Sequence, residues 1–239
     1  MKLISYRRYL IILAALYLPY WIALAIDPND RTTWLLENSL VFGFVAVIAL
    51  SYRGFPLSRV SYTLIFVFLC LHAIGAHYTY TEVPYDAWLR SAFGTDLKTA
   101  LGFERNHFDR LVHFCYGLLI AYPVREIFVR IADVRGFWGY FLPLDLTLSS
   151  SAIFELIEWG AAVVFGGDVG TAYLGTQGDE WDAQKDMAMA GLGALIAMSI
   201  TAAINVYMQR DFASELAHSL RVKHPHPLGE NPVRPRRKR

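Results

Sequence analysis

Acidic and histidine side chains recur at the same end of three separate apolar segments, and they are the residues of this chain best suited to chemistry. An ionisable group at the centre of a membrane helix costs roughly 2.5 to 3.5 kcal/mol on insertion scales, so several at one depth indicate a site. These residues are Asp109 and His113, Glu155 and Glu158, and Asp182 and Asp186.

Asp109, His113 and Tyr116 follow one another at helical spacing, at positions i, i+4 and i+7. Side chains with this spacing share one face of a helix. A carboxylate beside an imidazole orients the ring and raises its basicity, as in acid–base catalysis or in the support of a metal ligand. The alternative is an Asp and a His that only cap a helix at the membrane interface.

Glu155 and Glu158 end a polar stripe that begins at Thr147 and Ser151. Two neighbouring carboxylates repel each other when both are ionised, so one should be protonated unless a cation lies between them. The structural alternative is a glutamate paired with Arg110 to hold two helices together.

Asp179, Asp182 and Asp186 lie at i, i+3 and i+7 if the last apolar helix has begun by then. The helix dipole favours acids in the first turn, which accounts for one or two of them. It accounts poorly for Asp186, because that residue leads into a face of small side chains suited to close helix contact. This face consists of Ala190, Gly193, Ala194 and Ala197.

A cofactor, if there is one, would be a divalent metal, since imidazole and carboxylate together suit such ions. His72 and His77 lie about 140° apart on a helix and cannot both ligate one ion unless the helix unwinds. The chain has no HExxH, GxSxG or P-loop motif, which excludes those catalytic classes by sequence. The candidate metal ligands are His77, His113, Glu155 and Asp182.

The elements that must position these residues are membrane helices. The 239 residues are 55% apolar and 15% aromatic, which is typical of a polytopic membrane protein. About 20 mostly apolar residues span a bilayer, so we predict an all-α bundle of about six transmembrane helices in residues 1–210. The expected spans are Tyr9–Ile26, Trp34–Tyr52, Val60–Ala76, Phe108–Arg130, Phe137–Phe165 and Lys185–Tyr207. Pro123 and Pro143 suggest kinks or helix ends in the fourth and fifth spans.

Lys and Arg gather in alternate loops, which predicts the orientation of the bundle. Basic residues precede the first span, join the second to the third and the fourth to the fifth, and follow the sixth. Both termini should therefore be cytoplasmic, and the acidic site should lie at the outer face. We expect the first span to be a retained helix rather than a cleaved signal peptide, because it is long enough to cross the membrane.

Residues 211–239 form a basic, proline-rich segment that we expect to be a disordered cytoplasmic tail. Its charge favours membrane lipids as partners and argues against nucleic acid, since a basic tail beside a membrane contacts anionic lipid. The sequence names no protein partner.

The strings HAIGAHYTY, NHFDRLVHFCYG, FELIEWGA and GDEWDAQKDM resemble those of the YjdF family of bacterial inner-membrane proteins, over most of the chain before the tail. That resemblance implies a multi-pass inner-membrane protein and supplies no reaction. A remoter resemblance is to VanZ-like membrane proteins, at Asp109, Arg110, His113, Glu155 and Asp186, with Ala190 where that pattern carries Asn. It implies a cell-envelope context.

Three classes of function stay open at this point. The first is a membrane enzyme acting on a lipid or polyprenyl head group. The second is a protein that binds or transports an amphiphile or relays protons. The third is a scaffold whose polar pairs only fix helix packing. For the first class, the catalytic candidates are Asp109, His113, Glu155, Glu158 and Asp186.

Overall fold

The structure is a computed structural model that describes residues 5–103, 105–167, 170, 174–208 and 212–223. The described part of the chain is helical and contains no strand, which confirms the all-α prediction. The long helices are α1 Tyr6–Ala25, α2 Arg31–Ser51, α3 Arg59–His77, α6 Phe108–Ile131, α7 Trp138–Phe165 and α9 Asp182–Met208. The short helices are α4 Tyr85–Phe93, α5 Leu97–Leu101 and α10 Phe212–Ser219.

These six long helices are the six expected spans, each long and apolar enough to cross a membrane. The predicted limits agree with the observed helices to within about three residues at each end. α9 begins at Asp182 rather than Lys185 and so takes Asp182 into its first turn. At 28 residues, α7 is about 42 Å long, well beyond the roughly 30 Å hydrocarbon core.

The two prolines that suggested kinks or helix ends lie inside continuous helices. α6 runs through Pro123 and α7 runs through Pro143. The helix-end interpretation is therefore wrong for both. Both prolines are buried against neighbouring helices, and such packing keeps a membrane helix intact where the proline removes one backbone hydrogen bond.

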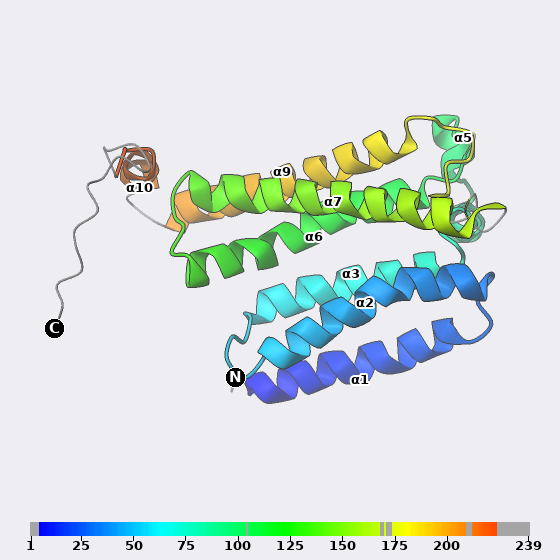
Figure 1. Cartoon of the computed structure of the whole chain (residues 1–239), viewed down its shortest axis with the longest axis horizontal. Helices are drawn as coiled ribbons and strands as arrows, with labels where there is room; N and C mark the ends of the chain where they lie inside the picture. The colour runs from blue at the N-terminus through cyan, green and yellow to red at the C-terminus, as the bar shows by residue number, and fades with distance from the viewer. Residues whose placement is uncertain (1–4, 104, 168–169, 171–173, 209–211, 224–239) are drawn as a thin grey trace.

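The bundle has two halves joined along α3 and α6 (Figure 1). One half holds α1 and α2, which pack against α3; the other holds α6, α7 and α9, which pack against one another. The contact of α3 with α6 joins the halves. α2 and α7 border the junction on the same side but do not pack closely against each other.

The closest contact in the bundle is between the backbones of α6 and α9. A Cβ atom added at Gly117 would lie 1.9 Å from the Ala190 carbonyl oxygen, and one added at Gly193 would lie 2.1 Å from the Phe114 carbonyl oxygen. Only glycine permits this approach. The small-residue face predicted for the last span is thus the face that α9 presents to α6.

Short helices cap the two ends of the bundle (Figure 1). α5 lies at one end, and α10 lies at the opposite end. α10 is held there by the α6–α7 loop, where the Gly136 amide donates to Glu215 and the Phe137 amide donates to the Ser219 hydroxyl. The expected disordered tail, 211–239, therefore includes a short helix at its start, and residues 224–239 lie outside the described residues.

We predict that Gly193→Ala lowers the free energy of unfolding by about 1 to 3 kcal/mol, because the new methyl group forces the α6 and α9 backbones apart. Gly160→Ala is the matched control, since a Cβ at Gly160 in α7 meets no other atom within 4 Å. Unfolding in mixed micelles, followed by circular dichroism, measures both variants. Equal stability of the two variants would contradict the close α6–α9 contact.

Candidate functional site

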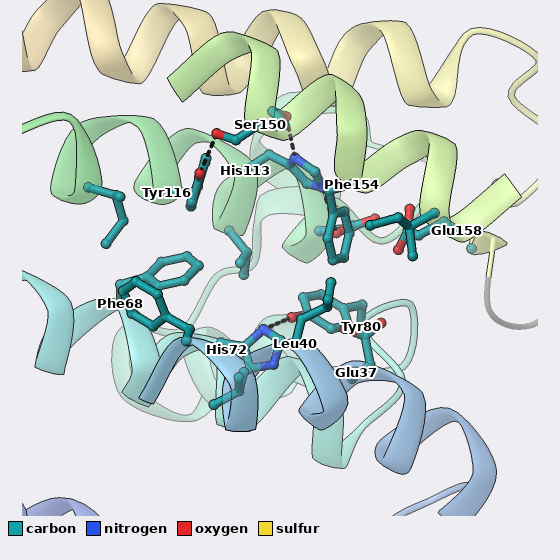
Figure 2. A pocket seen from close by; sticks show the side chains of 18 of the residues that line it. Glu37, Leu40, Phe68, His72, Tyr80, His113, Tyr116, Ser150, Phe154 and Glu158 are labelled. Carbon is teal, nitrogen blue, oxygen red and sulfur yellow. Dashed lines mark hydrogen bonds and ion pairs between the residues drawn. The ribbon is translucent and has the colours of Figure 1, made fainter. Parts of the chain in front are cut away.

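A cavity of about 280 Å³ lies where the two halves of the bundle meet. Its walls come from α2, α3, α6 and α7, with the loop residues Thr79, Tyr80 and Gly175 at one end. Figure 2 looks into it: Glu37 and His72 lie on one wall, and His113 and Glu158 lie on the opposite wall.

The cavity is polar at the end near α4 and α5. Glu37 of α2, Asp109 and His113 of α6 and Glu158 of α7 all line it. Glu37 is 3% exposed, and both His113 and Glu158 are 7% exposed. Three carboxyl groups and one imidazole, from three helices, thus face a common space within the membrane-spanning part of the bundle.

His113 is held between two carboxylates and a hydroxyl. Its Nε2 atom lies 3.3 Å from Oε1 of Glu155 and 3.6 Å from Oδ1 of Asp109. Its Nδ1 atom lies 3.3 Å from the Ser151 hydroxyl, and the ring packs edge-on against Phe154. An imidazole with a carboxylate at one nitrogen and a hydroxyl at the other can exchange a proton with a molecule in the cavity.

The sequence-predicted residues therefore converge, although not all of them reach the cavity. Asp109, His113 and Glu158 line it, whereas Glu155 lies behind the ring of His113. Asp186 also lies behind the wall, 4.0 Å from Nε of Arg110. The predicted polar stripe of α7 faces inward, and its first two residues, Thr147 and Ser151, are buried.

A second polar group, the arginine–aspartate cluster of Arg105, Arg110, Asp179, Asp182 and Lys185, lies beyond this wall. Arg110 donates to Asp179 at 2.5 Å and to Asp182 at 3.0 Å. Arg105 reaches Asp182 at 2.7 Å, and the Lys185 ammonium donates to Asp179 at 2.7 Å. Arg110 is thus paired with aspartates that precede and open α9, and not with a glutamate of α7 as the packing alternative had it.

The four candidate metal ligands occupy three different places. His113 and Glu155 are in contact, but Asp182 is taken by the two arginines. His77 lies at the end of α3, where its Nδ1 atom is 2.8 Å from the carbonyl oxygen of Leu24. Among the described residues, no three His, Cys, Asp or Glu side chains are arranged to hold a metal ion. The metal site stays a prediction without a preformed cage.

A tyrosine from the loop after α3 completes the polar end of the cavity. The Tyr80 hydroxyl is 2.5 Å from Nδ1 of His72, an interaction that is drawn in Figure 2. Thr79 and Tyr80 both have left-handed backbones, with φ of 54° and 53°. A Cβ atom at Gly75 would lie 2.5 Å from the Tyr80 ring, so this glycine makes room for it. Strain of this kind persists where surrounding contacts impose it.

The side of the cavity between α2 and α7 is apolar and open. Four lining residues there remain exposed: Leu40 at 42%, Phe44 at 37%, Ile153 at 57% and Ile157 at 41%. We call these four residues the apolar rim. Since the surface of the long helices faces lipid in a membrane, the rim belongs to the lipid-facing surface of the bundle.

Sequence reasoning missed Glu37, Tyr80 and the role of His72. Glu37 carried a usable signal, because an acidic residue inside an apolar span marks a candidate site by itself. It was overlooked because it has no acidic or histidine neighbour at helical spacing. Tyr80 carried no such signal, since its place depends on the turn after α3.

Comparison with known proteins gives the family of the chain. Residues 9–206 match the family described as "Predicted membrane protein (DUF2238)". The chain belongs to this DUF2238 family. It is also 39% identical to the inner membrane protein YjdF of Escherichia coli (strain K12) over 188 residues, which are 78% of this chain and 86% of that protein. No solved structure matches the chain significantly.

Family membership and six apolar helices make this DUF2238 chain a multi-pass membrane protein, consistent with the inner membrane. The resemblance to the YjdF family is confirmed. The resemblance to VanZ-like proteins stays a prediction.

We predict that Asp179 contributes stability that is lost in acid. The Lys185 ammonium and the Arg110 guanidinium hold the pKa of its carboxyl well below its usual range. A carboxyl with a lowered pKa stabilises the fold above its unfolded pKa of about 3.9, and the contribution disappears as pH falls toward the folded value. Asp179→Asn should therefore lower the unfolding temperature at neutral pH, and the difference from wild type should shrink below about pH 4.

The control for this prediction is Asp133→Asn, which removes an ion pair with Arg135 in which both side chains are more than half exposed. Exposed pairs of this kind contribute little. Thermal unfolding from pH 3 to pH 8 compares the three proteins. A difference between wild type and Asp179→Asn that is constant over the whole range would be evidence against the ion cluster.

Proposed function

We propose that this protein binds an amphiphile of the membrane, with the polar head in the cavity and the apolar chain passing out between α2 and α7. The observation that carries the proposal is the division of the cavity into polar inner walls and an apolar open side. Its inner walls present Glu37, Asp109, His113 and Glu158, and its open side is the apolar rim. An amphiphile has the same division into a polar and an apolar part.

The depth of the polar groups supports a membrane ligand. Glu37 is six residues into α2, and Glu158 is seven residues from the end of α7, so each lies roughly 10 Å from its helix end. In a helix that spans the roughly 30 Å hydrocarbon core, a residue at this distance from the end lies inside the core, where a membrane lipid can reach it. A water-soluble ligand would need an opening at the helix ends, where Thr79, Tyr80 and Gly175 line the cavity.

Lateral entry follows from the packing of the bundle. α2 packs against α3 and not closely against α7, so the wall between α2 and α7 consists of the side chains of the apolar rim. Binding sites are commonly concave, mostly apolar and supplied with a few polar groups that orient the ligand. The cavity between the halves has this character.

The matched test uses two tryptophan substitutions on α2. Leu40 belongs to the apolar rim, whereas Val45 is equally exposed, at 40%, but lies about 140° around the helix and outside the cavity. We expect wild type and Val45→Trp, extracted with native lipid in polymer-bounded discs, to be enriched in one lipid class over the surrounding membrane. Leu40→Trp should lose this enrichment several-fold, because the indole fills the opening. Lipid mass spectrometry makes the measurement.

Two results of that measurement would refute amphiphile binding. One is an identical lipid composition in all three proteins, and the other is a composition equal to that of the bulk membrane. Circular dichroism of each variant separates a blocked opening from a failure to fold.

The proposal places the polar end of the cavity at the outer face, in line with the positive-inside rule. In a background without Cys70 and Cys115, an impermeant maleimide should label Ser91→Cys, in α4, from outside the inner membrane. It should label Ser51→Cys, at the other end of α2, only after the membrane is opened. Both serines are exposed, so accessibility is matched. The reverse labelling pattern would place the site at the cytoplasmic face.

A further inference from the structure

We infer that the head group bound in this cavity is cationic, a protonated amine, rather than a phosphate. This inference rests on the proposed function, since it names the chemical class of the amphiphile. It is carried by the carboxyl groups among the lining residues, by one carboxyl oxygen without a hydrogen-bond partner and by the aromatic side chains of the walls.

The cavity is lined by several carboxyl groups and by no Lys or Arg side chain among the described residues. Glu37, Asp109 and Glu158 face it from three helices. A phosphate brought into this space would meet three carboxyl groups without a basic partner. An ammonium group would meet three acceptors, and hydrogen bonds between charged partners are roughly twice as strong as neutral ones.

The two arginines near the cavity are bound to aspartates on the far side of its wall. Arg110 is bound to Asp179 and Asp182, and Arg105 is bound to the same two aspartates. Each guanidinium therefore has carboxylate partners in the arginine–aspartate cluster and does not line the cavity. The bundle contains arginines close to the site, yet the cavity is lined by carboxyl groups and imidazoles and by no Lys or Arg among the described residues.

Glu37 is an independent sign of a missing partner. It is 3% exposed and lines the cavity, and its Oε2 atom has no hydrogen-bond partner among the described residues. A buried acceptor left without a donor is costly, so such an atom calls for an explanation. An amine held between Glu37 and the opposite wall supplies the donor.

Aromatic rings make up much of the remaining wall. Those that line the cavity are Phe44, Phe68, Tyr80, Tyr116 and Phe154, from α2, α3, the following loop, α6 and α7. The faces of aromatic rings attract cations such as an ammonium group. Rings and carboxylates together favour a cation over a neutral sugar.

The volume of the cavity fits a head group and not a whole lipid. Pockets that enclose a complete small ligand usually measure about 300 to 1,000 Å³. At about 280 Å³, the cavity holds the polar part, while the chain leaves across the apolar rim.

The test compares three probes that share one saturated chain: an alkylammonium, an alkyl phosphate and an alkyl alcohol. Titration calorimetry of the full-length protein in maltoside micelles, with empty micelles as the blank, gives the affinity of each. We expect the ammonium to bind roughly tenfold more tightly than the phosphate. Glu37→Gln should remove most of this preference, whereas Glu82→Gln, at an exposed position bonded to Asn29, should leave it unchanged.

The outcomes distinguish a failure of the cationic head group from a failure of amphiphile binding itself. Tighter binding of the phosphate or the alcohol, abolished by Leu40→Trp, overturns the cationic head group and leaves amphiphile binding intact. Absence of binding by all three probes, or binding that Leu40→Trp does not change, overturns amphiphile binding and the inference with it. If Glu37→Gln does not fold, the order of the three affinities in wild type decides the matter.

Discussion

The backbone contact of α6 with α9 is the interaction on which the rest of the site depends. Gly117 and Gly193 let the two helices touch, and this fixes how α6 is turned about its axis. One face of α6 then meets the start of α9, where Arg110 donates hydrogen bonds to Asp179 and Asp182. The neighbouring face, with Asp109 and His113, is left for α7 and the cavity. A larger residue at either glycine would separate the helices and move both sets of side chains.

This geometry divides acidic residues that look alike in the sequence into two kinds. Asp179 and Asp182 balance the charge of arginines, and they hold the loop between α5 and α6, together with the first turn of α6, against the start of α9. Asp109, Glu158 and Glu37 have no guanidinium partner and face a cavity. A buried ion pair is a structural arrangement whose two charges cancel. Carboxyl groups gathered without a counter-charge leave a region that attracts protons or cations.

The sequence predicted the framework because membrane helices are specified locally. An uninterrupted apolar run of sufficient length is enough, which is why all six spans were found to within a few residues. The convergence of His113 with Asp109 and Glu155 was also predictable, since helical spacing and a common membrane depth already imply it. Proline was a poor guide, because the helix ends expected near Pro123 and Pro143 depend on packing that the local sequence does not reveal.

What the sequence could not supply are contacts between residues far apart in the chain. The pairing of Arg105 with Asp182 joins a loop to the start of a helix, and the sequence around either residue gives no sign of it. The place of Tyr80 depends on two left-handed residues and on the space beside Gly75. The short helices α4 and α5 are followed by Gly94 and Gly102, both with left-handed backbones typical of helix C-caps. These helices are too short to show an apolar period in the sequence.

Helix packing alone accounts for the arginine–aspartate cluster but not for Glu37. A scaffold needs its polar groups paired across helices, as Arg110 is paired with Asp182. Glu37 lies inside a membrane helix, is almost fully buried and leaves one oxygen without a partner. Because an acidic residue inside a membrane helix is costly, alanine or leucine would serve a scaffold better. The presence of an acid at this position, opposite Glu158 and beside an opening to the bilayer, therefore favours a ligand that supplies what the protein lacks.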